Sequence, residues 1–545
     1  MTSLTGEEET QFRAALGLLQ SGAWHLAHQA LRTLEAHHPH PLVLANLALA
    51  EEHLGLESEA RQHHEAAIQQ APDSPDLRFN WANFLARPGT RAAILLARAQ
   101  YLAVLALDPH HLGAWINLGT GLVDTDHLEA AKTAFMAALT IDPQHLGALL
   151  NLAQVALGQQ ENDRAAQLFE QVLSIDPHSL EAHRGLATSA SRLGQEDKAA
   201  LHRQLGYGPQ PEIFLPGREN ALPTVLILAS AADGNIPWQP LLDRQHHHTR
   251  ILALEFFPKN SPLPPHDLLF NAVGDADRCP EALALALQRW QRRAPQIPAR
   301  NDPQRVRATA RTELGQLSAG IPGLSSARVE CFLRPAQASP RETADLLERW
   351  LAARGYVFPL LLRAPGFHGG QYFERVHSAT DLPALLERLP GPSLLVLECL
   401  PSQGRDGTYR KFRVMTLGGN LYPIHLALST HWKVHYFSAE MSTRPDFREE
   451  EQAFLADYRT FLGSTAVGVL EALQDRLGLD YAGMDFALDP EGNVLLFEAN
   501  ATMVLHPPPE DPVWDYRRPA FEDALKAARS LMNPFASDGK PLPNS

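Results

Sequence analysis

Three polar side chains in an otherwise apolar stretch are the first candidates for chemistry in this sequence. The stretch 481–503 alternates strand-forming residues, yet it contains Asp485, Glu498 and Asn500. Two carboxylates that face each other repel and weaken a sheet unless a cation lies between them. Two carboxylates and an amide oxygen are hard ligands of the kind that magnesium prefers. The alternative interpretation is an exposed hairpin face with scattered acids.

The position of the turn decides whether these carboxylates meet. A tight turn centred on Glu491–Gly492 pairs Asp489 with Val494. Counting outward in the same register places Asp485 directly opposite Glu498. Asn500 lies two residues further along the strand and therefore shares the same face. The hairpin is predicted to form a magnesium site.

Two earlier features are typical of nucleotide sites. Arg363 ends an expected strand and is followed by a glycine-rich stretch that includes Gly369 and Gly370, where backbone N–H groups can close over phosphates. Another expected strand ends at Glu398 and Leu400, whose backbone groups can face the edge of an adenine. Each feature alone is a weak signal, because many hairpins carry glycine and many strands end in a loop.

Cationic residues lie between the second of these strands and the acidic hairpin. Lys411 and Arg413 alternate on one strand and share a face, and His425 and Lys433 follow them. Positive charge opposite a bound magnesium ion would neutralise phosphate oxygens. The competing interpretations are cations on an exposed sheet face and, for His425, a packed core histidine.

In this order, the features resemble the ATP-grasp superfamily over residues 300–532. The resemblance implies an α+β fold with two subdomains that hold ATP between them, and ATP and magnesium, with two ions, as cofactors. It implies a metal set, a cofactor-binding set and a catalytic set. The metal set is Asp485, Glu498 and Asn500, the cofactor-binding set is Arg363, Gly369, Gly370, Glu398, Leu400 and Lys411, and the catalytic set is Arg413, Lys433 and His425.

The resemblance departs from the family pattern in two places. Arg363 stands where the family usually has a lysine, although arginine can bind phosphate through two nitrogens. The family's earlier phosphate-contacting lysine has no obvious counterpart, and Arg307 or Arg311 are the candidates to replace it.

The first two hundred residues repeat. The tripeptides Leu107–Pro109, Ile141–Pro143 and Ile175–Pro177 are spaced 34 residues apart. This is the tetratricopeptide pattern, in which small residues let two helices approach, large ones fill the gap and proline ends the second helix. Residues 8–205 are predicted to form an all-α solenoid of five or six helical hairpins.

The rest of the chain divides by composition and pattern. Residues 206–222 are rich in Gly and Pro and are predicted as a linker. Residues 223–299 alternate buried strands with a helix, which indicates an α/β domain with a parallel sheet, similar to the domain that precedes ATP-grasp folds. Within residues 300–532, the stretch 302–320 is expected to be one amphipathic helix. Residues 533–545 are predicted as a flexible tail.

Composition limits the partners. The net charge of −15 over 545 residues argues against a nonspecific binder of nucleic acid or of an anionic membrane. The apolar runs are too short to span a bilayer, and three widely spaced cysteines with an acidic N-terminus favour the cytoplasm. Because solenoid grooves commonly hold peptides, the expected partner is a peptide or protein substrate, with a small-molecule amine or amino acid as a second one.

The resemblance implies an ATP-dependent carboxylate–amine ligase, an ADP-producing enzyme that forms an amide through an acyl-phosphate. With the solenoid, it predicts modification of a peptide or protein. Two alternatives stay open: a non-catalytic solenoid scaffold whose ATP-grasp region only binds nucleotide, and a phosphotransferase on the same fold.

Overall fold

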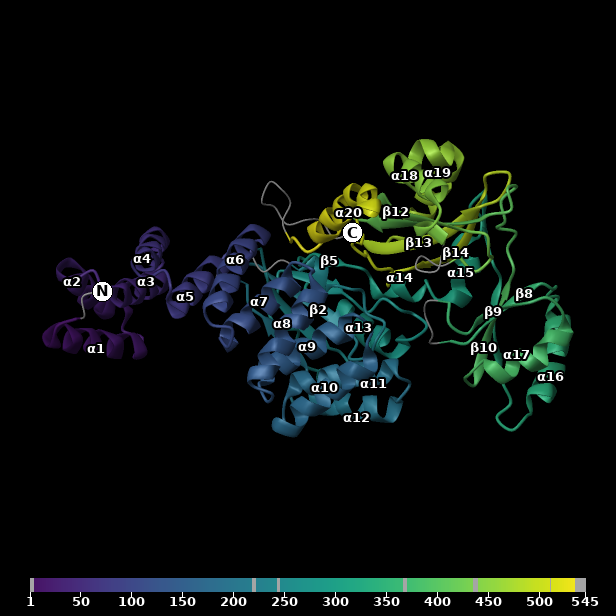
Figure 1. Ribbon diagram of the computed structural model, residues 1–545. Helices are drawn as coiled ribbons and strands as arrows, with labels where there is room; N and C mark the ends of the chain where they lie inside the picture. The colour runs from purple at the N-terminus through teal and green to yellow at the C-terminus, as the bar shows by residue number, and fades with distance from the viewer. Residues whose placement is uncertain are drawn as a thin grey trace. The chain divides into compact units, whose positions relative to one another are not determined.

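The computed structural model divides into two compact units, residues 1–206 and 207–545. The residues that it describes are 4–217, 222–242, 246–365, 370–434, 440–509 and 511–534 (Figure 1). Among them, no helix is both long enough and apolar enough for a bilayer crossing.

The first unit consists of helices that pack in consecutive pairs. They are α1 Gly6–Gln20, α2 Trp24–His37, α3 Pro41–Leu54, α4 Glu57–Gln70, α5 Pro75–Ala86, α6 Arg91–Leu107, α7 Leu112–Asp124, α8 Leu128–Ile141, α9 Leu146–Gly158, α10 Asn162–Ile175, α11 Leu180–Arg192 and α12 Glu196–Tyr207. A Cβ added at Gly119 of α7 would come within 2.5 Å of the Phe135 ring of α8, which shows how closely paired helices approach. The predicted all-α solenoid is confirmed, over residues 6–207.

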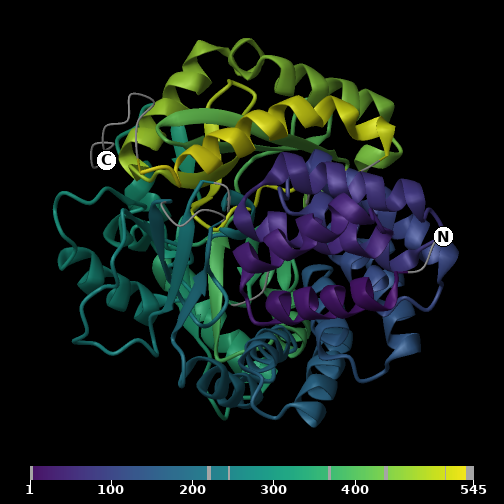
Figure 2. The same ribbon diagram turned by 90° about the vertical axis from the view of Figure 1, so that its left-hand side faces the viewer.

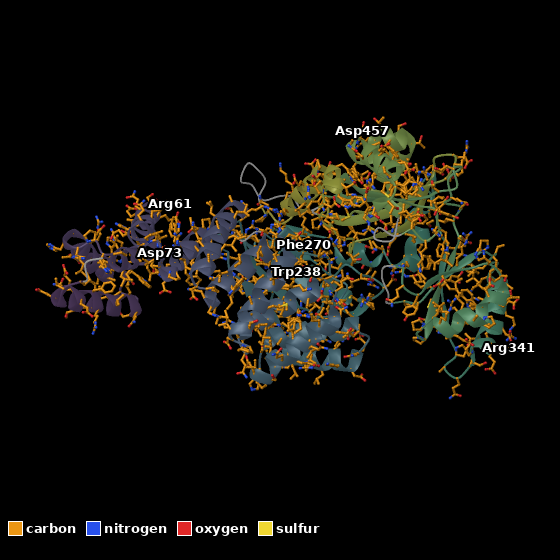
Figure 3. All side chains as sticks on the ribbon, in the orientation of Figure 1. Arg61, Asp73, Trp238, Phe270, Arg341 and Asp457 are labelled. Carbon is orange, nitrogen blue, oxygen red and sulfur yellow. The ribbon has the colours of Figure 1, made fainter. Side chains whose placement is uncertain are left out.

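The second unit begins with a five-stranded sheet in the order β1-β3-β2-β4-β5. Its strands are β1 Glu212–Leu215, β2 Thr224–Ala229, β3 His248–Ala253, β4 Leu268–Asn271 and β5 Ala299–Arg300, with helix α13 Pro280–Gln291 and the short helix η1 Gln239–Leu241. All neighbours are parallel except β1, which pairs antiparallel with β3. We call it the parallel sheet. Phe270 of β4, labelled in Figure 3, is fully buried, as expected for strands covered on both faces.

The segment 206–222 differs from the predicted linker. Its residues Glu212–Leu215 form β1 and pair with residues 249–252 of β3. The prediction rested on glycine and proline content, and the short apolar run between them was too brief to read as a strand. The segment therefore contributes the edge strand of the parallel sheet.

A four-stranded antiparallel sheet follows, in the order β7-β10-β8-β9. Its elements are β7 Val329–Leu333, α16 Pro340–Arg354, β8 Leu360–Arg363, β9 Phe373–Val376, η3 Ala379–Asp381, α17 Leu382–Arg388 and β10 Ser393–Glu398. The apolar side chains of α16 and α17 form one core with Leu360, Leu362 and Leu394 of the strands. This sheet carries the strand ends at Arg363 and Glu398.

The last sheet has the order β12-β11-β13-β14-β6, and we call it the C-terminal sheet. Its elements are β6 Leu324–Ser326, β11 Tyr409–Leu417, β12 Asn420–Ser429, η4 Glu440–Ser442, α18 Pro445–Ala456, α19 Tyr458–Leu477, β13 Tyr481–Leu488, β14 Val494–Asn500, η5 Pro512–Arg517 and α20 Arg518–Ser530. One face packs on α18 and α19, and the other shares a core with the parallel sheet and α20. Helix α20, yellow in Figures 1 and 2, packs against β11 and β12.

The stretch 302–320 is not the single helix that its pattern predicts. It breaks into α14 Pro303–Arg307, η2 Arg311–Glu313 and α15 Leu314–Ser318. Ala310 has an extended backbone, with φ −54° and ψ 144°. The backbone N–H of Arg311 points to the carboxylate of Asp277, at 3.3 Å, instead of to a helical carbonyl. A tertiary contact therefore overrides the local helical preference.

Candidate functional site

The acidic hairpin brings its carboxylates together as predicted. Asp485 of β13 pairs with Glu498 of β14, and Asn500 pairs with Gly483. Met484 of β13 contributes to the core with α18 and α19, so Asp485 projects to the opposite face of the C-terminal sheet. The two carboxylates therefore lie on the face that is turned toward the parallel sheet.

The register near the turn is one residue away from the prediction. Leu488, and not Asp489, pairs with Val494. A β-bulge between the Leu496 and Glu498 positions adds one residue to β14 and restores the predicted offset. Asp489 instead accepts backbone N–H groups of the turn, which holds the hairpin closed. The predicted pairing at the functional end is thus correct because the bulge compensates for a turn that is one residue longer than predicted.

Asp485 is buried and holds two cations. Arg413 donates from Nε to Oδ1 at 2.6 Å and from Nη2 to Oδ2 at 2.8 Å, and Lys411 donates from Nζ to Oδ2 at 2.9 Å. Only 3% of Asp485 is exposed. Burial alone would raise the pKa of Asp485, but the charges of Arg413 and Lys411 outweigh burial and hold that pKa below its ordinary value. Asp485 is ionised at neutral pH.

Glu498 is held by a residue from outside the hairpin. Arg311 donates from Nη2 to Oε1 of Glu498 at 2.5 Å and from Nη1 to Oδ2 of Asp277 at 2.7 Å. Burial works to raise the pKa of Glu498, but the charges of Arg311 and Arg363 lower it below its ordinary value. Both predicted metal carboxylates are therefore ionised, and each is neutralised by side chains of the same chain.

Arg363 lies at the end of a strand, as predicted. It ends β8, and its guanidinium lies 5.8 Å from the centre of the Phe373 ring on the neighbouring strand. Burial lowers the pKa of Arg363, and the like charge of Arg311 lowers it further, while Glu498 opposes both. The structure thus brings Arg363 into the same electrostatic environment as Arg311 and Glu498.

The glycine stretch is described in part. Gly369 lies outside the described residues. Gly370 has φ +75°, a left-handed conformation that suits glycine. A Cβ at Gly370 would lie 2.9 Å from Cε of Lys433, so this lysine lies beside the glycine stretch. Among the described residues, Lys433 forms no ion pair with the two hairpin carboxylates.

His425 lies next to Arg413, on the neighbouring strand. The two residues pair across β12 and β11, and 4% of His425 is exposed. Burial, followed by the charge of Arg413, lowers the pKa of His425 well below its ordinary value. The imidazole is neutral at neutral pH and adds no positive charge behind the guanidinium.

Glu398 and Leu400 lie where the chain crosses from the four-stranded sheet to the C-terminal sheet. The backbone N–H of Glu398 donates to the carbonyl of Arg328 at 3.1 Å, and the Glu398 carboxylate accepts the Arg328 N–H at 3.2 Å. The carbonyl of Leu400 accepts the N–H of Ser402 at 2.9 Å, while within the described part of the chain the Leu400 N–H has no partner. Arg328 lies in the other segment that connects the two sheets. Glu398 therefore joins the two connecting segments through its hydrogen bonds.

The donor types fit magnesium. Asp485 and Glu498 supply ionised carboxylates, which metal ligation needs. Asn500 supplies an amide oxygen, which accepts the N–H and the hydroxyl of Thr502 at 3.0 Å. Among the described residues, no group of three or more His, Cys, Asp or Glu side chains is placed to hold a metal, so Asn500 is needed to complete a set of three.

Sequence reasoning missed one residue of this site and left a second as one of two alternatives. Asp277 follows β4, and the signal for it is an acid at the carboxyl end of a parallel strand, where ligands commonly bind. Arg311 was one of two candidates from the sequence, and the structure distinguishes them. Arg307 is exposed, whereas Arg311 is inside the charged cluster.

Sequence reasoning also missed Glu451, which supports the strand next to Arg413. Glu451 of α18 is fully buried and accepts hydrogen bonds from Arg517, Tyr516 and the backbone N–H of Leu426. Leu426 follows His425, so this group fixes β12 next to Arg413. Its signal in the sequence is weak, because one glutamate in an acidic amphipathic helix resembles a solvated one.

Comparisons with known proteins identify the first unit. Tetratricopeptide repeat family models match residues 12–75, 112–145 and 156–201. The chain therefore carries an N-terminal tetratricopeptide repeat region over residues 12–201. Such repeats generally mediate protein–protein interactions. A search of curated proteins gave no match.

Solved structures similar to the chain include three bacterial proteins. MamA from Desulfovibrio magneticus is 19% identical, covering 30% of this chain and 90% of its own, with a TM-score of 0.28. The pilF protein of Pseudomonas aeruginosa is 18% identical, and the match covers 37% of this chain and 92% of pilF, with a TM-score of 0.34. The thermophilic repeat protein TTC0263 of Thermus thermophilus is 16% identical, and the match covers 34% of this chain and 98% of TTC0263, with a TM-score of 0.28.

Proposed function

We propose that this chain is an ATP-dependent carboxylate–amine ligase, which forms an amide through an acyl-phosphate on a peptide or protein substrate. One observation carries the proposal. Asp485 and Glu498 lie opposite each other on the C-terminal sheet, and both are ionised within a cluster of cations. The cations are Arg311, Arg363, Lys411 and Arg413.

The proposal rests on an ATP-grasp fold for residues 300–532. Its support is the succession of a four-stranded antiparallel sheet and a larger, mostly antiparallel sheet, each covered by helices. Two crossings, at 327–328 and 399–408, connect these sheets. A nucleotide bound beside the crossings would have its adenine at Leu400 and its phosphates at Arg363 and the glycine stretch.

The chemistry needs neutralised charge more than it needs a protein nucleophile. The γ-phosphoryl group passes to a substrate carboxylate and ADP is released. An amine then attacks the acyl carbon, phosphate leaves and the nitrogen loses a proton. In this scheme Arg363 and Lys433 bind phosphate oxygens, and Arg413 neutralises the acyl-phosphate.

Magnesium would be held by Asp485, Glu498 and Asn500, and when bound it would supply positive charge that stabilises phosphate groups. Lys411 and Arg413 orient Asp485 through three hydrogen bonds. His425 stays neutral beside Arg413, so the guanidinium keeps its full attraction for anions.

The tetratricopeptide region supplies the substrate in this proposal. Its repeats stack into a solenoid, a fold that offers a long surface to an extended peptide. We assign it to the protein or peptide that is modified, and the amine to a small molecule such as an amino acid.

The test is ADP formation by the full chain with a panel of peptide, protein and amine acceptors. Glu498→Gln should abolish acceptor-dependent ADP formation, and Asp485→Asn should reduce it at least about 100-fold. Glu491→Gln is the matched control, since Glu491 is exposed in the turn of the same hairpin. Mass spectrometry then identifies the new bond.

Three outcomes distinguish the candidate functions. A new amide with ADP supports the ligase. A phosphorylated hydroxyl identifies a phosphotransferase. Nucleotide binding without turnover for every acceptor indicates the non-catalytic scaffold.

A further inference from the structure

Arg311 connects the parallel sheet to the acidic hairpin. It lies on η2, at the break in the expected helix, and 17% of its side chain is exposed. Its two terminal nitrogens divide between Asp277, which follows β4, and Glu498 in β14. Its backbone N–H also points to Asp277, at 3.3 Å. One residue thus joins two carboxylates that are 221 positions apart in the sequence, 498 minus 277.

The Glu498 oxygen that Arg311 contacts is also a predicted magnesium ligand. Oε1 of Glu498 accepts Nη2 of Arg311 at 2.5 Å, and this same carboxylate belongs to the predicted magnesium set. A guanidinium and a divalent cation on one carboxylate repel each other strongly in a buried site. Arg363 adds to that repulsion, because it is close enough to Arg311 to be influenced by its charge. The two cations cannot both keep Glu498 as their main partner.

The cations that neutralise Asp485, unlike Arg311, lie on a strand of the C-terminal sheet. Arg413 lies on β11, in register with Asp485, so this pair is part of the sheet. Arg311 lies on a short turn that is preceded by the extended Ala310, and its other hydrogen bonds among the described residues go to Asp277. Arg311, the partner of Glu498, can therefore leave without disturbing the strands.

We propose that Arg311 is an exchangeable counter-ion of Glu498, which a divalent cation must displace when it binds the hairpin. Arg311 then stays attached to Asp277, and the connection between the parallel sheet and β14 opens. Arg311 is a positioning residue in this scheme, because it acts through Glu498. The inference rests on the proposed function, since it takes from it the metal role of Glu498.

The decisive experiment measures metal binding without nucleotide. The full chain is titrated with Mn²⁺ alone, a paramagnetic substitute for Mg²⁺, and the free ion is followed by electron paramagnetic resonance. Arg311→Ala should tighten Mn²⁺ binding about tenfold, the change that one charge-assisted hydrogen bond is worth. Arg307→Ala, an exposed arginine in the same segment, should leave it unchanged.

Two further variants keep the test valid if Arg311→Ala folds poorly. Arg311→Lys keeps the charge but cannot form two divergent hydrogen bonds, so it should tighten Mn²⁺ binding less than alanine does. Asp277→Asn weakens the anchor of Arg311 and leaves the hairpin intact. Circular dichroism melting of each variant shows that the fold is kept.

The outcomes separate this inference from the proposed function. Unchanged or weaker Mn²⁺ binding by both Arg311 variants overturns the inference, whether or not the chain turns over ATP. If Glu498→Gln binds Mn²⁺ as well as the parent, Glu498 is not a ligand and the inference also fails. If tighter binding appears but no acceptor yields ADP, the inference holds and the ligase proposal fails.

Discussion

Arg413 and Asp485 face each other across β11 and β13 and are joined by two parallel hydrogen bonds, of 2.6 and 2.8 Å. Fork-to-fork pairing of this kind fixes the orientation of both side chains. Because Asp485 is almost fully buried, its charge depends on Arg413 and Lys411 for compensation. The negative charge of the site is thus already balanced in the absence of ligand.

Removal of Arg413 should destabilise the second unit. Arg413→Met leaves a buried carboxylate with Lys411 as its remaining cation, and the free energy of unfolding should fall by about 3–5 kcal/mol. Urea denaturation of the full chain measures the change, with Arg307→Met as the exposed control. The double variant Arg413→Met with Asp485→Leu should recover part of the loss, because no charge then stays buried. A loss below about 1 kcal/mol would contradict the burial described here.

Glu451 should be equally sensitive. It is fully buried and its carboxylate accepts hydrogen bonds from Tyr516 and Arg517, both at 2.5 Å. Glu451→Ala removes the carboxylate that compensates the charge of the buried Arg517 guanidinium, so the free energy of unfolding should fall by about 3–5 kcal/mol. Glu449→Ala, an exposed change on the same helix, is the matched control. Equal midpoints of denaturation for the two variants would show that Arg517 finds another partner.

The solenoid should tolerate one glycine replacement and resist another. A Cβ at Gly185 would overlap the Phe169 ring, so Gly185→Ala should lower the free energy of unfolding by about 1–3 kcal/mol. Gly158, at the end of α9, has open space around it, and Gly158→Ala should be neutral or slightly stabilising. Thermal denaturation followed by circular dichroism compares the two. Equal melting temperatures would mean that the helices separate to admit the methyl group.

The first repeats should lose stability as pH rises. His63 donates to Glu51 at 2.6 Å and to Glu35 at 3.0 Å, and its pKa is raised above 6.5, chiefly by the hydrogen bond to Glu51. The folded state therefore favours protonated His63. Its contribution is complete below pH 6.5 and disappears as pH rises through the folded-state pKa.

The measurement is the melting temperature of the full chain between about pH 6 and about pH 8. His63→Gln should reduce the fall in melting temperature across this range, since the variant keeps a polar side chain that does not titrate. His37→Gln, an exposed histidine at the end of α2, is the control for general pH effects. Identical pH profiles for the parent and His63→Gln would refute the assignment.

Sequence pattern predicted the elements better than the contacts between them. The solenoid follows from a fixed repeat, whereas the pairing of Asp485 with Glu498 was counted from a turn register that is one residue off and that a β-bulge corrects. The break before Arg311 could not be predicted, because its causes are Asp277 and Glu498, which are 34 and 187 residues away. The local pattern there is truly helical, and only the folded chain reveals the competing ion pairs.

In the candidate site, too, the sequence predicted the strand positions better than the contacts between side chains. The sequence indicated which strand positions carry charge, and the strands place Lys411, Arg413 and Asp485 on one face. It could not show that these charges neutralise one another, because that depends on the side-chain conformations that join neighbouring strands of the C-terminal sheet. The register near the turn was wrong for a related reason, since a β-bulge has no reliable signature in the residues of β14.

The edge strand β1 determines where this protein can be divided. It pairs with β3 and follows α12 after only residues 208–211. A fragment that starts at residue 223 would lack β1 and expose the full length of β3 as an open edge, which invites pairing with a second copy and aggregation. A fragment that starts just before Glu212 keeps that edge covered. Any attempt to produce the second unit alone should therefore cut the chain between Tyr207 and Glu212.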